Sequence, residues 1–190
     1  MGTLTSPRAL RTRERILDAA LDLFERHGYD ATTTAQIAAA AGVTPMTFFR
    51  HFPTKESVLV SDPFDPMIAA VVSAQPVELP AFERVRRGLL AAVSQLPASE
   101  DASARRRVAI VAAVPGLRAA TAASTQATQD AIVDRLHAQG VQRFAATVAS
   151  AACLAAITAA LMAWTQLPSG TSLAEVVRSA LLELAPQDLR

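Results

Sequence analysis

The amino-acid sequence predicts an all-helical protein of about nine helices. Of its 190 residues, 51% are hydrophobic and only 5% are aromatic, and much of the apolar share is alanine, the strongest helix former. Apolar residues recur at helical spacing, and no run alternates polar and apolar residues as a half-buried strand does. Proline and glycine separate these segments, as they commonly do between helices.

The first helix is expected over residues 12–27. Ile16, Ala20 and Phe24 recur on one face of this segment, as the apolar stripe of a helix does. Gly28 follows at the position where a left-handed residue often ends a helix.

Two short helices are expected next. Thr33 and Gln36 have the spacing of a capping box, and Gly42 stands near the end of the helix that they begin. Thr44 is then placed to cap a third helix, with Pro45 at its first position, where a missing N–H costs nothing. Two short helices around a three-residue turn that contains glycine form a helix-turn-helix unit.

The rest of the chain is also expected to be helical. The expected segments are 55–74 with an interruption at Pro63 and Pro66, then 81–96, 102–114, 120–138, 142–166 and 173–185. Thr171 or Ser172 is expected to cap the last helix, and Pro186 to end it.

The bulk composition limits the chemistry that the chain can perform. The net charge of +1 does not itself indicate a nucleic-acid partner. Cys153 is the only cysteine, which excludes a disulfide within the chain and a metal site built on several cysteines. The three histidines lie far apart in sequence. No catalytic residue, metal or cofactor is expected, and without a signal peptide the expected location is the cytoplasm.

Residues 144–164 carry no charge over about the length of a membrane span. Alanine is their main residue, and they lack an aromatic or basic belt at both ends. We therefore expect no membrane contact. A helix buried between two subunits explains the same run, because small side chains let two helix backbones approach closely.

Three segments near the N-terminus share a further pattern. They read Ile16–Leu17–x–Ala19–Ala20–x3–Phe24–x3–Gly28, Thr33–Thr34–x2–Ile37–Ala38–x2–Ala41–Gly42–Val43–Thr44 and Thr47–Phe48–Phe49–Arg50–His51–Phe52–x2–Lys55–Glu56. Together they resemble the DNA-binding domain of the TetR family of bacterial regulators. The resemblance implies a flexible arm at 1–10, a helix-turn-helix DNA-binding domain at 11–57, and a ligand-binding and dimerisation domain at 58–190.

The resemblance also implies which residues meet DNA. They are Thr34, Thr44, Pro45, Met46, Thr47, Phe49, Arg50, His51 and Lys55. The start of a recognition helix enters the major groove, where Arg50 can bind guanine through two hydrogen bonds or hold a phosphate. Pro45 and Met46 offer apolar contact, for instance to a thymine methyl, although Met46 could instead fill a gap in the core. The positions that match phosphate-binding residues of the family are Thr34, Thr47, His51 and Lys55.

Two features of this region leave alternatives open. Phe49 stands where the family usually has tyrosine, whose hydroxyl generally meets a phosphate, so that contact is either lost or replaced by apolar packing on the sugar. Four arginines stand close to the N-terminus, at positions 8, 11, 13 and 15. They belong either to a solvated tail or to an arm that reaches phosphates.

The last two helices are expected to form a homodimer. The helix over 142–166 is apolar on all sides, with one stripe through Leu154 and Leu161 and another through Phe144 and Val148. A helix of this kind must be covered on all sides, and a partner subunit that completes a four-helix bundle would cover it.

A ligand pocket is implied among the middle helices. The candidate lining residues are Phe64, Met67, Phe82, Leu89, Ile110, Met162 and Trp164, for each of which a place in the core is the favoured alternative. The scarcity of polar groups favours an apolar effector. Two arginine clusters, at 84, 86 and 87 and at 105–107, are either solvated helix faces or the mouth of a site for an acidic ligand.

The expected function is ligand-responsive regulation of transcription. The homodimer is expected to bind a palindromic operator in double-stranded DNA as a repressor, and to be released by a small apolar or amphipathic effector. One alternative is a helical ligand sensor of the same fold that binds no DNA. A helical enzyme is a further alternative, for which the sequence offers no nucleophile elbow, phosphate loop or metal-ligand spacing.

Overall fold

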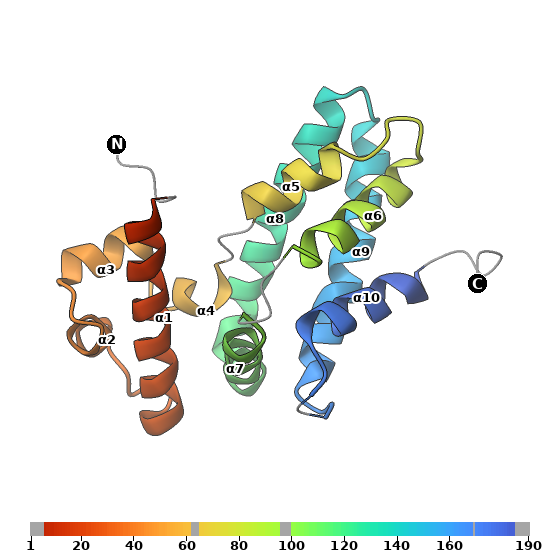
Figure 1. Cartoon of the computed structure of the whole chain (residues 1–190). Coiled ribbons are helices and arrows are strands. Elements are labelled where there is room, and N and C mark those ends of the chain that lie inside the picture. The colour runs from red at the N-terminus through yellow and green to blue at the C-terminus, as the bar shows by residue number, and fades with distance from the viewer. Residues whose placement is uncertain (1–5, 62–64, 96–99, 169, 185–190) are drawn as a thin grey trace. The chain divides into compact units, whose positions relative to one another are not determined.

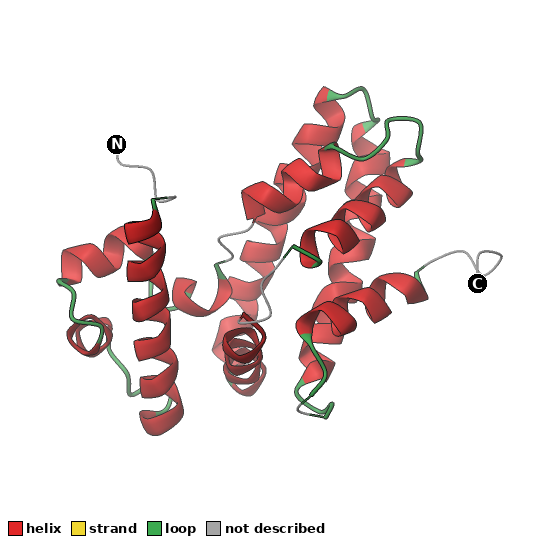
Figure 2. Ribbon diagram, viewed as in Figure 1, coloured by secondary structure: helices red, strands yellow, loops and turns green. Residues whose placement is uncertain are grey.

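The computed structural model describes residues 6–61, 65–95, 100–168 and 170–184. These residues form ten α-helices and one short 3-10 helix and contain no strand (Figure 2), which confirms the predicted fold class. In chain order (Figure 1) the helices are α1 Pro7–His27, α2 Thr34–Ala40, α3 Pro45–His51, α4 Ser57–Val60, α5 Asp65–Ser73, α6 Ala81–Val93, α7 Glu100–Ala113, η1 Pro115–Leu117, α8 Arg118–Ala138, α9 Arg143–Trp164 and α10 Leu173–Glu183. The predicted fourth helix appears as two helices, α4 and α5. Pro66, expected in the interruption, lies instead in the first turn of α5, and Pro63 lies outside the described residues.

The helices form two compact units. The N-terminal unit combines Met1–Ser61 with Arg106–Thr121, and the C-terminal unit combines Asp62–Arg105 with Ala122–Arg190. The boundaries fall inside α7 and α8, so each of these two helices has residues in both units.

Helix α1 begins earlier than predicted. The hydroxyl of Ser6 caps it by accepting a hydrogen bond from the backbone N–H of Ala9 at 3.2 Å, and Pro7 follows in the first turn, where proline is well tolerated. Residues 7–10, which were expected in a flexible arm, are therefore helical. Residues 1–5 lie outside the described part of the chain.

Helices α5, α6, α8, α9 and α10 share the hydrophobic core of the C-terminal unit. Its buried members are Ala69, Val72, Val85, Leu89, Val93, Ile132, Val133, Leu136, Ala146, Ala149, Cys153, Leu154, Val177 and Leu181. Helix α6 lies at the centre of this core, because it packs against α5, α9 and α10.

The close packing of α5 on α6 depends on Gly88. A Cβ atom at this position would lie 2.5 Å from the Cα of Val72, far inside ordinary van der Waals contact. Backbone atoms cannot move aside as a flexible side chain does, so the two helices would have to separate.

We expect Gly88→Ala to lower the free energy of unfolding by about 1–3 kcal/mol, the usual cost of overpacking a core. Urea unfolding of the variant measures this loss. Gly116→Ala is the control, since no atom lies within 4 Å of the Cβ that it would add. Equal stability of the two variants would show that α5 does not approach α6 this closely.

Helix α9 has one covered face and one exposed face. Ala146, Ala149 and Cys153 are buried in the core, whereas on the opposite side Phe144 is 80% exposed and Val148 is 52% exposed. Among the described residues, α9 is the one unbroken helix that is long and apolar enough to cross a membrane. Core helices of soluble proteins also meet these criteria of length and composition. In the described part of the chain, nothing covers this exposed apolar face.

Candidate nucleic-acid interface

Helices α2 and α3 form the predicted helix-turn-helix. The capping box of Thr33 and Gln36 begins α2, and the hydroxyl of Thr44 accepts from the backbone N–H of Thr47 at 3.1 Å to begin α3. Gly42 takes a positive φ of 63° in the turn between them, a conformation that glycine adopts without strain. The predicted caps of both helices are confirmed.

Two arginines of α1 hold this motif in place. The guanidinium of Arg15 donates to the carbonyl oxygens of Ala41 and Gly42 in the turn. That of Arg13 donates to the carbonyls of His51 and Ser61, both at 3.1 Å, and lies 4.2 Å from the centre of the Phe52 ring. These side chains belong to the frame of the domain, so the predicted arm does not include them.

The core of the motif determines which face of α3 is turned outward. Phe48 and Phe52 are fully buried, and their ring centres lie 6.1 Å apart. The neighbouring Met46 is 83% exposed and Phe49 is 48% exposed. Met46 therefore does not fill a gap in the core. Helix α3 presents Met46, Phe49 and the exposed Arg50 to solvent.

His51 and Lys55, two of the predicted phosphate contacts, both contact other parts of the protein. His51 is only 7% exposed, and burial, followed by the charges of Arg50 and Arg13, lowers the pKa of its imidazole. A buried imidazole whose charged form is disfavoured is poorly suited to a phosphate, which counts against this contact. The Lys55 ammonium donates to the carbonyls of Tyr29 at 2.9 Å and Thr32 at 3.1 Å, which leaves it one further N–H.

The remaining predicted contacts lie at the starts of the two helices. Thr34 is the half-exposed first residue of α2, and Thr44 and Pro45 are exposed at the start of α3. The hydroxyls of Thr44 and Thr47 lie 3.0 Å apart. These polar groups and the exposed face of α3 therefore lie on one motif, as the resemblance implied.

A cleft of about 380 Å³ opens between the start of α1 and the start of α3. Its lining residues are Arg8, Arg11, Thr12, Arg15, Gly42, Val43, Thr44, Thr47 and Arg50. None of them is acidic, so the cleft is strongly positive. The sequence indicated the arginines of α1 but not that α3 lies against them.

The described candidate ligand residues are distributed over the two units. Phe64 lies outside the described residues, and Ile110 belongs to the N-terminal unit. In the C-terminal unit Met67, Phe82 and Met162 are half-buried and Leu89 is buried in the core. Trp164 is 1% exposed, and its indole N–H donates to the carbonyl of Thr171 at 2.9 Å. These contacts give Trp164 a place in the core.

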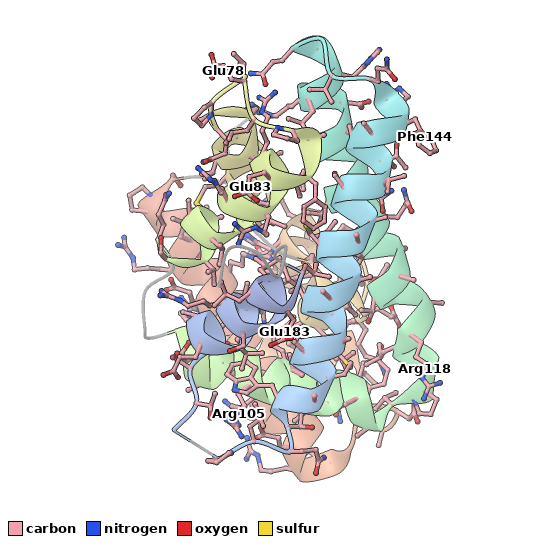
Figure 3. The ribbon with its side chains drawn as sticks, turned by 90° about the vertical axis from the view of Figure 1, so that its right-hand side faces the viewer. Glu78, Glu83, Arg105, Arg118, Phe144 and Glu183 are labelled. Carbon is pink, nitrogen blue, oxygen red and sulfur yellow. The ribbon has the colours of Figure 1, made fainter. Side chains whose placement is uncertain are left out.

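The first arginine cluster is largely engaged within the C-terminal unit. Glu83, labelled in Figure 3, lies 2.7 Å from Arg86 and 2.5 Å from Arg87. Hydrogen bonds from these arginines, Arg86 first, lower the pKa of Glu83 to about 2. The guanidinium of Arg84 is buried and donates to the carbonyl of Ser73 and the amide oxygen of Gln139. Arg84 and Arg86 therefore do not belong to a solvated face, whereas the Arg87 side chain is 52% exposed.

Two arginines of the second cluster, Arg105 and Arg106, also have partners. Arg105 (Figure 3) donates to the carbonyls of Trp164, Leu167 and Pro168 at the end of α9. Arg106, within the N-terminal unit, forms ion pairs of 2.6 Å with both Asp22 and Glu25 of α1.

Among the described residues no group of three or more His, Cys, Asp or Glu side chains is placed to hold a metal ion.

Family models match both parts of the chain. Residues 16–61 match the model described as bacterial regulatory proteins, tetR family. Residues 79–188, more than half of the chain, match the MftR C-terminal domain of TetR-type proteins. The chain belongs to the TetR family. The resemblance inferred from the motifs is thereby confirmed, over nearly the same N-terminal residues.

Named TetR-family relatives align with part of the chain. The regulator TcmR of Streptomyces glaucescens is 35% identical over 116 residues, which are 57% of this chain and 51% of TcmR. YvkB of Bacillus subtilis, an uncharacterized regulator, is 48% identical over 48 residues, 25% of each chain. The chain thus aligns with about half or less of the length of these relatives. They indicate no enzymatic family.

Solved structures share the TetR fold over almost the whole chain. NalD, the secondary repressor of the MexAB-OprM multidrug efflux pump in Pseudomonas aeruginosa, has a TM-score of 0.56 at 22% identity and covers 94% of this chain and 96% of its own. SmeT of Stenotrophomonas maltophilia in its complex with triclosan has a TM-score of 0.55 at 23% identity and covers 92% and 91%. At such identities the likeness concerns the fold.

Proposed function

We propose that this chain is a cytoplasmic transcriptional repressor that binds a palindromic DNA operator as a homodimer and is released by a small effector. The observation that carries the proposal is the exposed face of α3. Met46, Phe49 and Arg50 stand out from a helix that is capped, buried on its other side and held by two arginines of α1. Such a helix is suited to the major groove.

The exposed face of α9 supports the homodimer. Besides Phe144, which projects from the helix in Figure 3, and Val148, the exposed residues Ala155 and Ala159 lie on this same face. The exposed face of α10 is more polar, with Glu175, Arg178 and Ser179 beside Leu182. A second copy that covers α9 would bury the apolar face, and its two-fold symmetry suits a palindrome.

An amphipathic effector is supported by polar atoms inside the C-terminal unit. The Nε of Arg84 and the hydroxyl oxygens of Ser103 and Ser150 are buried without a hydrogen-bond partner. A buried polar group without a hydrogen-bond partner destabilises the folded state. A ligand whose polar end lies among the apolar side chains would form a hydrogen bond with one of these groups. Release follows if the effector prefers a conformation in which the two recognition helices no longer match the operator spacing.

The test is selection from a randomised DNA pool with the purified protein at two salt concentrations. Enrichment of a palindrome is the expected result, and the enriched DNA then serves as the probe in a search for effectors that release it. Phe49, which lacks the usual tyrosine hydroxyl, favours one other function, that of a ligand sensor of this fold without DNA. Selection that enriches no sequence, from a protein that still dimerises, would favour the sensor.

We expect Arg50→Ala to weaken binding to the selected operator by about 1–3 kcal/mol and to blur the preference at one base pair, because a guanidinium can bind guanine through two hydrogen bonds. Binding to selected and random DNA measures both effects. Arg26→Ala is the control, since Arg26 is exposed in the last turn of α1. An equal loss on both DNAs would mean that Arg50 binds only a phosphate.

A further inference from the structure

We propose that the cleft between α1 and α3 binds a phosphodiester group of the DNA backbone, which makes Arg8 and Arg11 DNA contacts. The proposal rests on the DNA-binding function proposed above and extends the interface from the helix-turn-helix onto the first turns of α1. The cleft has a volume of about 380 Å³, enough for a phosphate group and its ester oxygens.

The charges around the cleft favour an anion. Arg8, Arg11 and Arg15 line it from α1 and Arg50 lines it from α3, with no carboxylate among the lining residues. The ion pairs of the described residues involve none of these four arginines. Like charges gathered at one place repel each other unless an anion lies among them, and a guanidinium matches the oxygens of a phosphate.

The structure holds these groups ready before an anion binds. Because Ser6 caps α1 and the helix begins at Pro7, Arg8 and Arg11 project from an ordered helix rather than from a loose tail. The guanidinium of Arg15 is fixed on the carbonyls of Ala41 and Gly42. Groups that are already ordered lose less conformational entropy on binding.

Hydroxyl groups complete the set of donors. Thr44 and Thr47 line the cleft, and their hydroxyl oxygens lie 3.0 Å apart. One of the two hydroxyls donates to the other, so the second keeps its own O–H free for a phosphate oxygen. Charged and neutral donors thus surround the same space.

The position of the cleft favours DNA over a free phosphate as the source of this anion. Thr44, Thr47 and Arg50 line the cleft, and they also belong to the helix whose exposed face we expect in the major groove. A phosphodiester at the edge of that groove would lie next to the bases that α3 contacts. A free phosphate has the same chemistry, and the experiment separates the two sources.

The experiment measures how the affinity of the full-length protein for a random-sequence duplex depends on salt. The logarithm of the binding constant falls with the logarithm of salt concentration by about 0.9 for each phosphate neutralised. The Arg8→Ala/Arg11→Ala double variant, which loses the one phosphodiester contact of the cleft, is therefore expected to reduce the slope by about 0.9. Thermal unfolding followed by circular dichroism shows whether the variant folds as the wild type does.

Two further variants define the effect. Arg8→Lys/Arg11→Lys keeps both charges and is expected to keep the slope. Arg26→Ala removes an exposed arginine at the other end of the same helix and is expected to leave the slope unchanged. A wild-type slope in the Arg8→Ala/Arg11→Ala variant would overturn the proposal.

The source of the anion is tested with inorganic phosphate. One possible outcome is that phosphate raises the melting temperature of the wild type but not of the Arg8→Ala/Arg11→Ala variant, while DNA binding by the two proteins depends equally on salt concentration. The cleft then holds a free phosphate, and the assignment to DNA fails. Absence of duplex binding by the wild type at low salt would be a different failure, that of the proposed DNA-binding function, and the phosphodiester assignment would fall with it.

Discussion

Replacing Phe48 with alanine is expected to lower the free energy of unfolding of the N-terminal unit by about 3–5 kcal/mol, the usual cost of removing a buried phenylalanine ring. Phe48 is fully buried, and its ring meets those of Phe49 and Phe52 at 5.3 and 6.1 Å between centres. Helix α3 has only seven residues, too few to be stable without packing. Loss of this ring should therefore also abolish binding to the selected operator.

Urea unfolding followed by far-ultraviolet circular dichroism measures the loss. Fluorescence of Trp164 is recorded in parallel, because this residue is the only tryptophan of the chain and lies in the C-terminal unit. The expected result is that the variant loses its helical circular dichroism signal at a lower urea concentration than the wild type. An unchanged unfolding curve would mean that Phe48 is not at the centre of the N-terminal core.

The adjacent Phe49 provides the control with the same side chain. It is 48% exposed, so Phe49→Ala leaves a much smaller cavity and should cost less than about 1 kcal/mol of stability. If its ring packs against the DNA sugar in place of the tyrosine contact, operator affinity should nevertheless fall. A loss of stability as large as that of Phe48→Ala would contradict the division of α3 into a buried and an exposed face.

The helix boundaries could be predicted where the signal is local. The predicted capping box of Thr33 with Gln36 joins residues three apart, a spacing that the sequence alone reveals. For the last helix the sequence left Thr171 and Ser172 open as caps, and the cap is Ser172, in a capping box with Glu175. The separation of α4 from α5 was likewise expected from the local proline signal. Such signals sufficed for the fold class and for the helix-turn-helix that carries the candidate site.

The roles of the arginines could not be predicted, because their partners are distant in sequence. Arg15 binds a carbonyl 26 residues away, and Arg106 binds Asp22 across 84 residues. A run of arginines looks the same whether it is solvated or paired. Only the folded chain shows that Arg13 holds the motif, that Arg8 and Arg11 line the cleft, and that Arg15 does both.

His51 differs from these arginines, because a local signal was present. It follows Phe48 by three residues and precedes Phe52 by one, so helical spacing places it on the buried face of α3. The family position favoured a phosphate contact instead. Periodicity agrees here with the observed exposure of 7%.

The exposed face of α9 should be the place where a single charge has the largest effect on assembly. We expect Val148→Arg to convert the proposed dimer into a monomer. A two-fold interface buries the new charge twice, near its own copy, and an unpaired buried charge costs several kcal/mol. A monomer contacts only one half-site, so operator affinity should fall by about 10²–10⁴-fold, the gain that linking two binding sites provides.

Sedimentation equilibrium measures the assembly of this variant, and titration with the selected operator measures its affinity. Val77→Arg adds the same charge at a valine that is 64% exposed in the segment between α5 and α6, and it should leave both quantities unchanged. Comparison of the two variants shows whether the effect depends on where the charge is added or only on the added charge itself. A Val148→Arg protein that remains dimeric would remove α9 from the interface, and the apolar face of that helix would then need another cover.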